Sequence, residues 1–529
     1  MSHPLPKVSP SAFRNGTGRV MLARIRSVAL VGTEARIVDV EVAVTGTGLP
    51  GFSMVGLPAK TVREAEHRVH SAILCIGEKW PNGRKVANLA PGALRKDGAH
   101  FDLALAIGVL AGCKVIPQHA LDGWIVAGEL GLDASVRPVR GILAAAITAR
   151  RAEARGLICP SANAPEARLV EGIEVVPVTT LKECVDFLRG TWTPTELPSA
   201  PAASAPVYED MAEVRGHAQA KRTAEVVAAG GHNLLMVGAP GSGKTMLASR
   251  LPGILPPMSA EESIDTTCVY SVAGLLTEKA SLITARPFRS PHHNVSPAGL
   301  VGGGPGLPRP GEISLAHNGV LFMDELTLYR RDVLESLRGP LEDGRVRIAR
   351  SAGVVTFPSR FSLVAAMNPC PCGYQGDPSR ECGCTAEQIS RYKFRLSGPL
   401  LDRFDISVTM TRPTRQELVT DPEGESSQCI RERVVMARHI QAERYQSPTL
   451  TNASCPSRLV HETAMLLPAA RELLSAAIDR YRLSARGLVR SIRVARTIAD
   501  LAQSAEIHPD HMHHALGYRV FEDRHAVAI

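Results

Sequence analysis

The chain has 529 residues, of which 44% are hydrophobic and 21% are charged. This composition is ordinary for a soluble globular protein, and the length predicts about three or four domains. Aromatic residues make up only 4%, which disfavours a single-strand binder built on stacked aromatic rings. No apolar run approaches the ~20 residues that span a bilayer, and residues 1–16 lack the apolar stretch of a secretory signal.

We therefore expect a cytoplasmic protein without a membrane partner, in which the 11 cysteines stay reduced. The net charge of +8 mildly favours a polyanionic partner.

The first half of the chain predicts a tail, a domain and a linker. Residues 1–18 are predicted to be a disordered tail. Residues 19–190 predict an α/β domain, because residues 38–44 place a valine at every second position, as in a half-buried strand. Residues 191–207 are rich in Pro, Ala and Ser, which predicts a linker.

The second half predicts a larger α/β domain followed by helices. Within residues 208–410, the apolar runs at 233–238, 319–325 and 361–368 resemble strands of a parallel sheet buried on both faces. Residues 411–529 contain no strand-like run and show helical periodicity, which predicts a small helical domain.

The run at 233–238 leads into a glycine-rich segment with the spacing G-x-x-x-x-G-K-[ST]. Backbone N–H groups of such a loop cradle phosphates, and the following helix adds the positive end of its dipole. We expect Lys244 to reach the β- and γ-phosphates of ATP and the Thr245 hydroxyl to bind Mg²⁺. ATP and Mg²⁺ are thus the predicted cofactors. The loop residues are Gly238, Ala239, Pro240, Gly241, Ser242, Gly243, Lys244 and Thr245.

Polar residues end the other two apolar runs. Asp324 is expected to hold Mg²⁺, usually through water, and Glu325 to polarise the attacking water. Asn368 could orient that water or sense the γ-phosphate. In sequence with the other two motifs, Asn368 matches the sensor 1 position of AAA+ ATPases.

Two later segments resemble the helix-2-insert branch of AAA+ proteins, which includes magnesium chelatase ATPase subunits and minichromosome maintenance helicases. Residues 398–407 are similar to its arginine-finger segment, which implies that Arg403 stabilises transition-state charge on the γ-phosphate of a neighbouring subunit. The resemblance therefore implies a homo-oligomer, usually a hexamer. Residues 483–502 resemble the sensor 2 helix, in which Arg486 is the first candidate for contacting nucleotide and Arg490 the second.

Segments 290–304, 311–326, 342–353 and 368–378 are together similar to the ComM/YifB family of magnesium chelatase-like AAA+ ATPases. The similarity extends over about residues 20–520. It implies an α/β multidomain protein with an AAA+ P-loop NTPase core, a helix-2 insert and a small α-helical C-terminal lid. It also implies ATP-driven branch migration of DNA in recombination or natural transformation.

Residues 342–355 resemble the pre-sensor 1 β-hairpin, which projects into the central pore of related helicases. Arg345, Arg347 and Arg350 would then contact phosphates of single-stranded or branched DNA without sequence preference. A solvated, charged hairpin is the alternative. A magnesium chelatase-type ATPase subunit and an ATPase that remodels proteins are the alternative functions.

Four cysteines follow the pattern C-x-C-x9-C-x-C within residues 370–384. In a reducing compartment this clustering suggests a structural zinc site that closes a loop without a core of its own. Reduced free thiols are the main alternative, and an iron–sulfur cluster is a lesser one. The four candidates are Cys370, Cys372, Cys382 and Cys384.

The first domain resembles the Lon protease domain, which has a ribosomal protein S5-like fold, through residues 95–108 and 127–141. His100 stands where Lon has its nucleophilic serine, and Leu143 stands where Lon has its catalytic lysine. Because a Ser–Lys dyad needs both groups, we expect no peptidase activity. A platform for ring assembly or DNA binding is expected instead.

Overall fold

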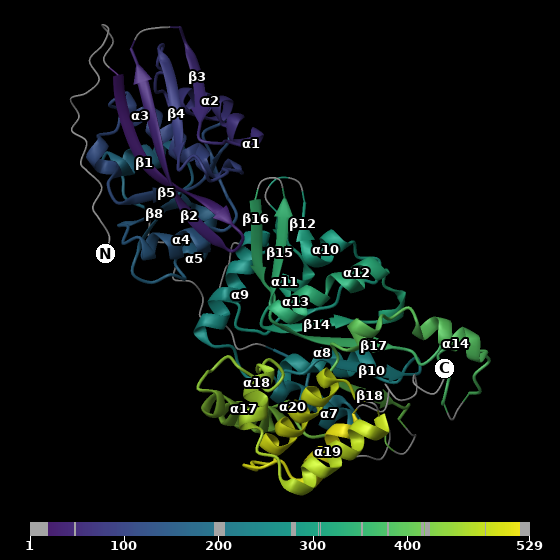
Figure 1. Cartoon of the computed structure of the whole chain (residues 1–529). Helices are drawn as coiled ribbons and strands as arrows, with labels where there is room; N and C mark the ends of the chain where they lie inside the picture. The colour runs from purple at the N-terminus through teal and green to yellow at the C-terminus, as the bar shows by residue number, and fades with distance from the viewer. Residues whose placement is uncertain are drawn as a thin grey trace. The chain divides into compact units, whose positions relative to one another are not determined.

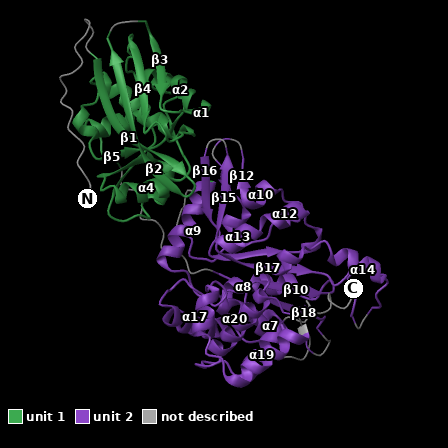
Figure 2. Cartoon of the chain, viewed as in Figure 1, with its two compact units in different colours: residues 1–200, 274–281 green, residues 201–273, 282–529 purple. Residues whose placement is uncertain are grey.

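The computed structural model describes residues 20–46, 49–194, 207–276, 282–304, 306, 308–350, 353–377, 380–413, 417, 424–481 and 483–518. The chain divides into two compact units, residues 1–200 with 274–281 and residues 201–273 with 282–529 (Figure 2). The predicted tail lies outside the described residues, as does most of the predicted linker.

The first unit is built on a seven-stranded mixed sheet with the order β3-β4-β2-β1-β5-β8-β9 (Figure 1). β1 and β2 form a long antiparallel hairpin, in which Val20 pairs with Thr45 and Val31 with Glu34. Val38 and Val40 on β2 are fully buried, as the valine alternation predicts. The strands are β1 (Val20–Val31), β2 (Glu34–Thr45), β3 (Gly51–Val55), β4 (Arg84–Ala90), β5 (Trp124–Val126), β6 (Glu129–Leu130), β7 (Val136–Arg137), β8 (Gly156–Pro160) and β9 (Glu174–Val178).

Helices cover this sheet, and α3 (Asp102–Gly112) contacts both β1 and β2. α3 is apolar almost throughout and nearly all of it is buried, because it packs between the sheet and α2. The remaining helices of the unit are α1 (Lys60–Arg63), α2 (Ala65–Cys75), α4 (Ile142–Arg151), α5 (Ala164–Ala167) and α6 (Leu181–Leu188).

The second unit contains a five-stranded sheet with the order β11-β14-β17-β10-β18, and all its pairs are parallel. Alternate residues of each central strand enter two different hydrophobic cores: Leu234 packs on one side of β10 and Leu235 on the other. The sheet is thus buried on both faces, which explains the continuous apolar runs in the sequence. The strands are β10 (Leu234–Gly238), β11 (Phe288–Arg289), β14 (Gly319–Met323), β17 (Phe361–Met367) and β18 (Ile406–Met410).

The C-terminal helices share one hydrophobic core with the sheet. Helix α17 contacts α7 and α8, and α20 contacts α7 and α17. One hydrophobic cluster therefore includes buried residues of the sheet, such as Leu234, and of the C-terminal helices, such as Ile498. These helices are α7 (Ala218–Gly230), α8 (Lys244–Ile254), α17 (Ser427–Tyr445), α18 (Ser457–Thr463), α19 (Pro468–Tyr481), α20 (Ala485–Leu501) and α21 (Pro509–Gly517).

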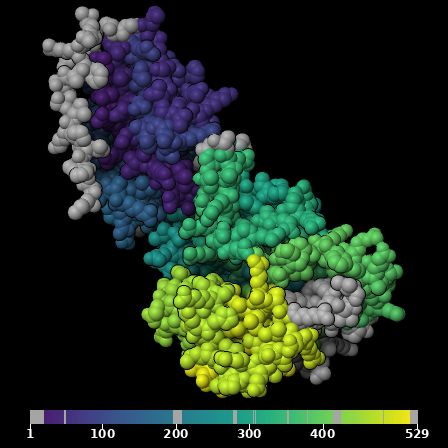
Figure 3. All heavy atoms as spheres, viewed as in Figure 1, coloured from purple at the N-terminus to yellow at the C-terminus, as the bar shows by residue number. Residues whose placement is uncertain are grey.

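The opposite face of the sheet carries short helices and two hairpins. The hairpin of β15 (Arg345–Arg350) and β16 (Gly353–Pro358) stands out from the rest of its unit (Figure 3). The other elements here are α9 (Ala260–Ala273), α10 (Pro297–Val301), β12 (Gly302–Gly303), β13 (Arg309–Pro310), α11 (Glu312–Leu315), α12 (Arg331–Ser336), α13 (Arg338–Asp343), α14 (Ala386–Lys393) and α15 (Gly398–Leu401). Within the described residues, no helix combines the length and apolarity needed to cross a bilayer.

Candidate active site

Three central strands of the parallel sheet end at the same edge. β10 runs into the glycine-rich loop, β14 into Asp324 and Glu325, and β17 into Asn368. The carboxyl ends of these three strands lie side by side, because Val237 pairs with Met367 and Met323 pairs with Ala365. Segments separated by more than a hundred residues in sequence are therefore brought to one edge, as is typical of ligand sites in open α/β sheets.

The glycine-rich loop turns directly into α8. Gly243 has a φ of 78°, a left-handed conformation that glycine adopts without steric cost, and it precedes the first helical residue, Lys244. The Lys244 ammonium is buried and donates hydrogen bonds to the carbonyl oxygens of Gly238 (2.8 Å) and Ala239 (2.9 Å). Its Nζ also lies 3.5 Å from Asn368 Oδ1. Burial lowers the pKa of Lys244, and the charges of nearby carboxylates act in the opposite direction.

Two oxygen ligands for a divalent cation meet beside this lysine. The Thr245 hydroxyl donates a hydrogen bond to Asp324 Oδ2 at 2.9 Å. A hydroxyl and a carboxylate at this separation fit Mg²⁺, which prefers hard oxygen ligands and shares its remaining positions with phosphates and water. The neighbouring Glu325 is exposed and has a φ of 50°, which is rare for a residue other than glycine and is commonest at functional sites.

His293 also lies at this edge, although the sequence indicated only a structural or surface residue there. Its Nδ1 lies 3.9 Å from Glu325 Oε2. His293 follows β11, and β11 pairs with β14, which leads to Glu325. The pairing of these two strands would have been the signal, but β11 has only two residues and no recognisable pattern.

Arg412 is a second residue that the sequence did not reveal. It follows β18 and donates hydrogen bonds from Nη2 (3.0 Å) and Nε (3.3 Å) to the carbonyl oxygen of Pro240. Its Nε also lies 3.6 Å from Asp377 Oδ2. Arg412 therefore links the glycine-rich loop to the segment that follows Asn368.

Arg403 lies at the other end of the sheet from this loop. Its carbonyl accepts a hydrogen bond from the side chain of Asn233, directly before β10, whereas the glycine-rich loop follows β10. The length of this strand, at ~3.3 Å per residue, separates the two ends by roughly 15 Å. An arginine side chain does not bridge that distance, so Arg403 cannot serve the loop of its own chain.

Glu342 on α13 forms an ion pair with Arg403 and lies 3.6 Å from Arg486. Arg403 and Arg486, which the sequence indicated as finger and sensor 2 candidates, thus lie beside the same carboxylate. Arg486 is largely exposed, with 61% of its side chain accessible. Arg490 is buried and instead holds the segment before β18, since it donates to the carbonyl oxygen of Phe404 at 2.7 Å and pairs with Asp402 at 3.2 Å.

The three hairpin arginines lie on β15, which begins two residues after α13 ends. Arg345 and Arg347 are exposed on one face, while Val346 between them is buried on the other. Arg350 is exposed near the turn and pairs with Gly353 across the hairpin.

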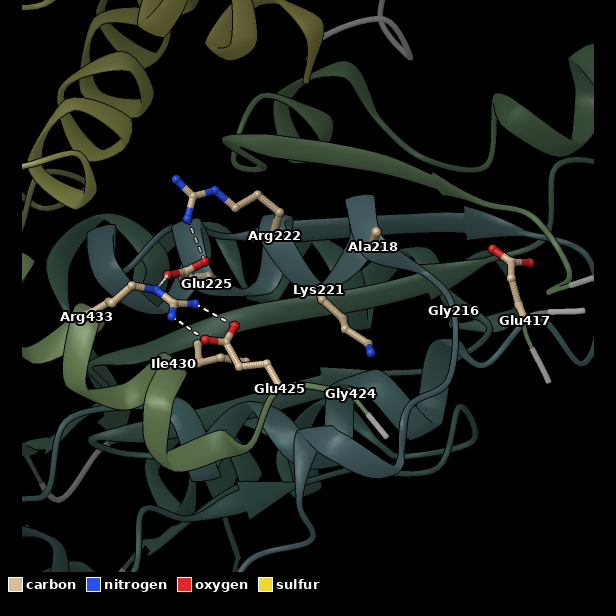
Figure 4. Close-up of a pocket in the computed structure, with 10 residues that line it drawn as sticks. All are labelled: Gly216, Ala218, Lys221, Arg222, Glu225, Glu417, Gly424, Glu425, Ile430 and Arg433. Carbon is tan, nitrogen blue, oxygen red and sulfur yellow. Dashed lines mark hydrogen bonds and ion pairs between the residues drawn. The ribbon is translucent and has the colours of Figure 1, made fainter. Parts of the chain in front are cut away.

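A pocket of about 510 Å³ opens between α7 and the start of α17 (Figure 4). Gly216 and Ala218 line it, and the intervening His217 lies against Gly243 of the glycine-rich loop. Charged residues line its other side, where Arg433 pairs with both Glu225 and Glu425.

Comparison with known proteins assigns the chain. Family models match residues 40–163 (Subunit ChlI of Mg-chelatase), 210–418 (Magnesium chelatase, subunit ChlI) and 424–519 (Magnesium chelatase, subunit ChlI C-terminal). The chain is 42% identical over 510 residues to the competence protein ComM of Haemophilus influenzae, covering 94% of this chain and 97% of ComM. It is 41% identical over 503 residues to the uncharacterised protein YifB of Escherichia coli, covering 95% and 97%. The chain belongs to the ComM/YifB family of magnesium chelatase-like proteins. The resemblance found in the sequence is thus confirmed, and the family supports an AAA+ ATPase that uses ATP and Mg²⁺.

The chain also has a more distant relative, Lon protease 2 of Bacillus subtilis, which is 24% identical over 180 residues, 31% of this chain and 32% of the protease. His100 is buried beside Phe101, with ring centroids 4.3 Å apart, and Leu143 is fully buried at the start of α4. These positions therefore hold neither the serine nor the lysine of a Ser–Lys dyad.

The four clustered cysteines of this family member lie between β17 and α14. Their sulfur atoms all fall within 4.8 Å of one another. The structure therefore brings together the residues that the spacing singled out, two positions after Asn368.

Proposed function

We propose that this protein is a cytoplasmic, hexameric AAA+ motor that couples ATP hydrolysis to branch migration of DNA, in recombination or natural transformation. The observation that carries the ATPase part is the meeting of the glycine-rich loop, Thr245 with Asp324, Glu325 and Asn368 at one edge of the sheet. Zinc at the four cysteines is no part of this proposal, because hydrolysis of this type requires only Mg²⁺.

The geometry suggests a division of labour for hydrolysis. Residues 238–243 and the N-terminus of α8 hold the phosphates by backbone N–H groups, and the Lys244 ammonium moves onto the β- and γ-phosphate oxygens. Thr245 and Asp324 would hold Mg²⁺, which neutralises charge that develops on the phosphates. Glu325 accepts the proton of the attacking water, and Asn368 orients that water against the γ-phosphate.

The position of Arg403 supports the oligomer. An arginine finger must reach a γ-phosphate, and Arg403 lies at the far end of the sheet from the loop of its own chain. If Arg403 is the finger, the γ-phosphate that it contacts belongs to a neighbouring subunit. Repetition of this head-to-tail contact closes into a ring, for which we propose six subunits from the resemblance to the helix-2-insert branch.

The DNA part rests on the hairpin and on a relative. Arg345, Arg347 and Arg350 carry exposed positive charge on a hairpin that stands out from its unit, which suits contacts to phosphates without sequence preference. ComM of Haemophilus influenzae is named a competence protein, and competence concerns the uptake and integration of DNA.

The pocket beside the glycine-rich loop is where we place the adenine ring. Gly216 and Ala218 line it, and His217 between them lies against Gly243 of the glycine-rich loop. The substitution Ala218→Trp would narrow the pocket. We expect it to raise the KM for ATP and to change kcat little.

One experiment tests the proposal. ATP hydrolysis by the purified full chain is measured alone, with single-stranded DNA, with a four-way junction, with an unfolded protein, and with a chelatase partner subunit. We expect stimulation by DNA, with the junction at least as effective, and a loss of more than ~10²-fold in Glu325→Gln. Hydrolysis that ignores every DNA but responds to unfolded protein would overturn the DNA motor in favour of protein remodelling. A response only to a chelatase partner subunit would favour the tetrapyrrole pathway.

A further inference from the structure

Four cysteines lie in the described residues 370–377 and 380–384, and Gly373 of this segment packs against Pro240 of the glycine-rich loop. This segment has little hydrophobic core, since Cys370 is buried but the other three cysteines are only partly covered. Three of the six sulfur–sulfur distances are 3.3 Å (Cys370 to Cys372), 3.6 Å (Cys370 to Cys382) and 3.6 Å (Cys372 to Cys382). The Cys384 sulfur lies within 4.8 Å of the other three.

These distances fit a metal better than they fit disulfides. A disulfide needs sulfur atoms about 2.05 Å apart, whereas four thiolates at ~2.3 Å from one zinc ion in a tetrahedron lie roughly 3.8 Å from one another. Four converging sulfurs would also repel as thiolates unless a cation neutralised them. We propose that Cys370, Cys372, Cys382 and Cys384 bind one Zn²⁺ ion.

The site would be structural, not catalytic. Four thiolates complete the tetrahedral shell of zinc and leave no position for water or substrate. Asp377, one of the two acidic residues of this segment, lies 3.6 Å from Arg412. Zinc would thus close a segment that has little apolar surface to bury, and its binding energy would become folding energy of the loop.

The closed loop braces the phosphate-binding loop. Gly373 has a φ of 85° and lies so close to Pro240 that an added Cβ would be 2.7 Å from Pro240 Cδ and 3.8 Å from Asn368 Cγ. Arg412 links the same Pro240 to Asp377, and its guanidinium lies 5.7 Å from the ring centroid of Tyr374. We expect zinc to fix the position of Asn368 relative to Pro240. This bracing role rests on the proposed ATP site.

Metal analysis of the full chain tests the first part. Protein purified under reducing conditions is expected to hold about one zinc per chain. The double variant Cys382→Ser/Cys384→Ser should lose it, and the matched control Cys429→Ser, at an exposed cysteine elsewhere, should retain it. Because the double variant could misfold, a second test uses the wild-type chain with Co²⁺ in place of zinc. A site of four thiolates is expected to give strong visible ligand-field bands and thiolate charge-transfer bands. Absence of bound metal in zinc-supplied protein, a Co²⁺ spectrum without thiolate bands, or iron with sulfide in place of zinc would overturn the site.

ATP kinetics test the bracing role separately. Removing zinc with a chelator should raise the KM for ATP several-fold, and adding zinc back should restore it, while the control Cys429→Ser shows no change. If the KM for ATP is the same with and without bound zinc, the metal site is retained but its bracing role at the glycine-rich loop is overturned. A chain that binds zinc but hydrolyses no ATP would contradict the proposed function alone.

Discussion

The Thr245 hydroxyl donates a hydrogen bond to the Asp324 carboxylate across 2.9 Å, joining the first turn of α8 to the end of β14. These residues are 79 positions apart, and the parallel sheet brings them together. The contact holds both oxygen ligands where one cation can use them, so the hydroxyl itself should matter more than the size of the side chain.

Replacing Thr245 separates these two properties. Thr245→Ser keeps the hydroxyl and should retain hydrolysis within a few-fold of wild type. Thr245→Val keeps the shape but loses the ligand, so we expect a fall of at least ~10-fold and a higher Mg²⁺ concentration for half-maximal activity. Titration of Mg²⁺ at saturating ATP measures both effects. Equal activity of the two variants would argue against Thr245 as a Mg²⁺ ligand.

A mixing experiment tests whether Arg403 acts on a neighbour. Arg403→Ala has an intact loop and Lys244→Ala has an intact finger, so each variant alone should be inactive. Random co-assembly of equal amounts restores a complete site at ~1/4 of the interfaces, and hydrolysis should recover to about that fraction. Mixing Arg403→Ala with Arg403→Lys gives the control. If the first mixture stays inactive although subunits exchange, the finger assignment is wrong.

Motifs within one segment could be predicted from sequence, because local geometry fixes them. The segment 238–245 needs only its glycines and the following helix to build a phosphate loop, and the four cysteines lie within 15 positions of one another. The buried strands were also predictable, since burial on both faces of a sheet leaves a continuous apolar run.

Contacts between distant segments could not be predicted where no motif marks both partners. The pairing of Glu342 with Arg403 spans 61 positions, and that of Arg412 with Pro240 spans 172. Both depend on which strands become neighbours, and a single charged residue carries no signal of its partner. The sequence did not predict that the sheet and the C-terminal helices share one hydrophobic core. The change of periodicity at residue 411 does not indicate whether the segments before and after it pack against each other.

The hairpin arginines make a prediction about salt. Arg345→Ala/Arg347→Ala removes two exposed charges from one face while Val346 and Ile348 keep the hairpin anchored. If both arginines contact phosphates, DNA affinity should fall and the slope of log K against log salt should decrease by about 2. DNA-free hydrolysis should stay near wild type. Arg391→Ala, an exposed arginine on α14, is the control, and an unchanged slope in the double variant would favour a merely solvated hairpin.

Acid should destabilise the protein partly through His317. This side chain is buried, and its Nδ1 accepts a hydrogen bond from the backbone N–H of Arg360 at 3.0 Å. Burial lowers the pKa of His317 to about 4, and the charge of Arg360 acts in the same direction. The unfolded chain, with a histidine pKa near 6.5, therefore binds more protons between these values. Stability is full above pH 6.5 and declines as the pH falls toward 4.

The loss that this one group causes at pH 5 is about 2 kcal/mol. His317→Asn removes the titration but keeps an oxygen that can accept from Arg360, so its unfolding midpoint in urea should fall less than that of wild type between pH 7.5 and 5. The exposed His461→Asn should follow wild type. His100, whose pKa burial also lowers to about 4, adds a loss of the same sign in the other unit, and it remains in both variants. Only the difference between His317→Asn and His461→Asn therefore isolates the contribution of His317. If the stability of the two variants depends on pH in the same way, burial does not keep His317 uncharged in the folded protein.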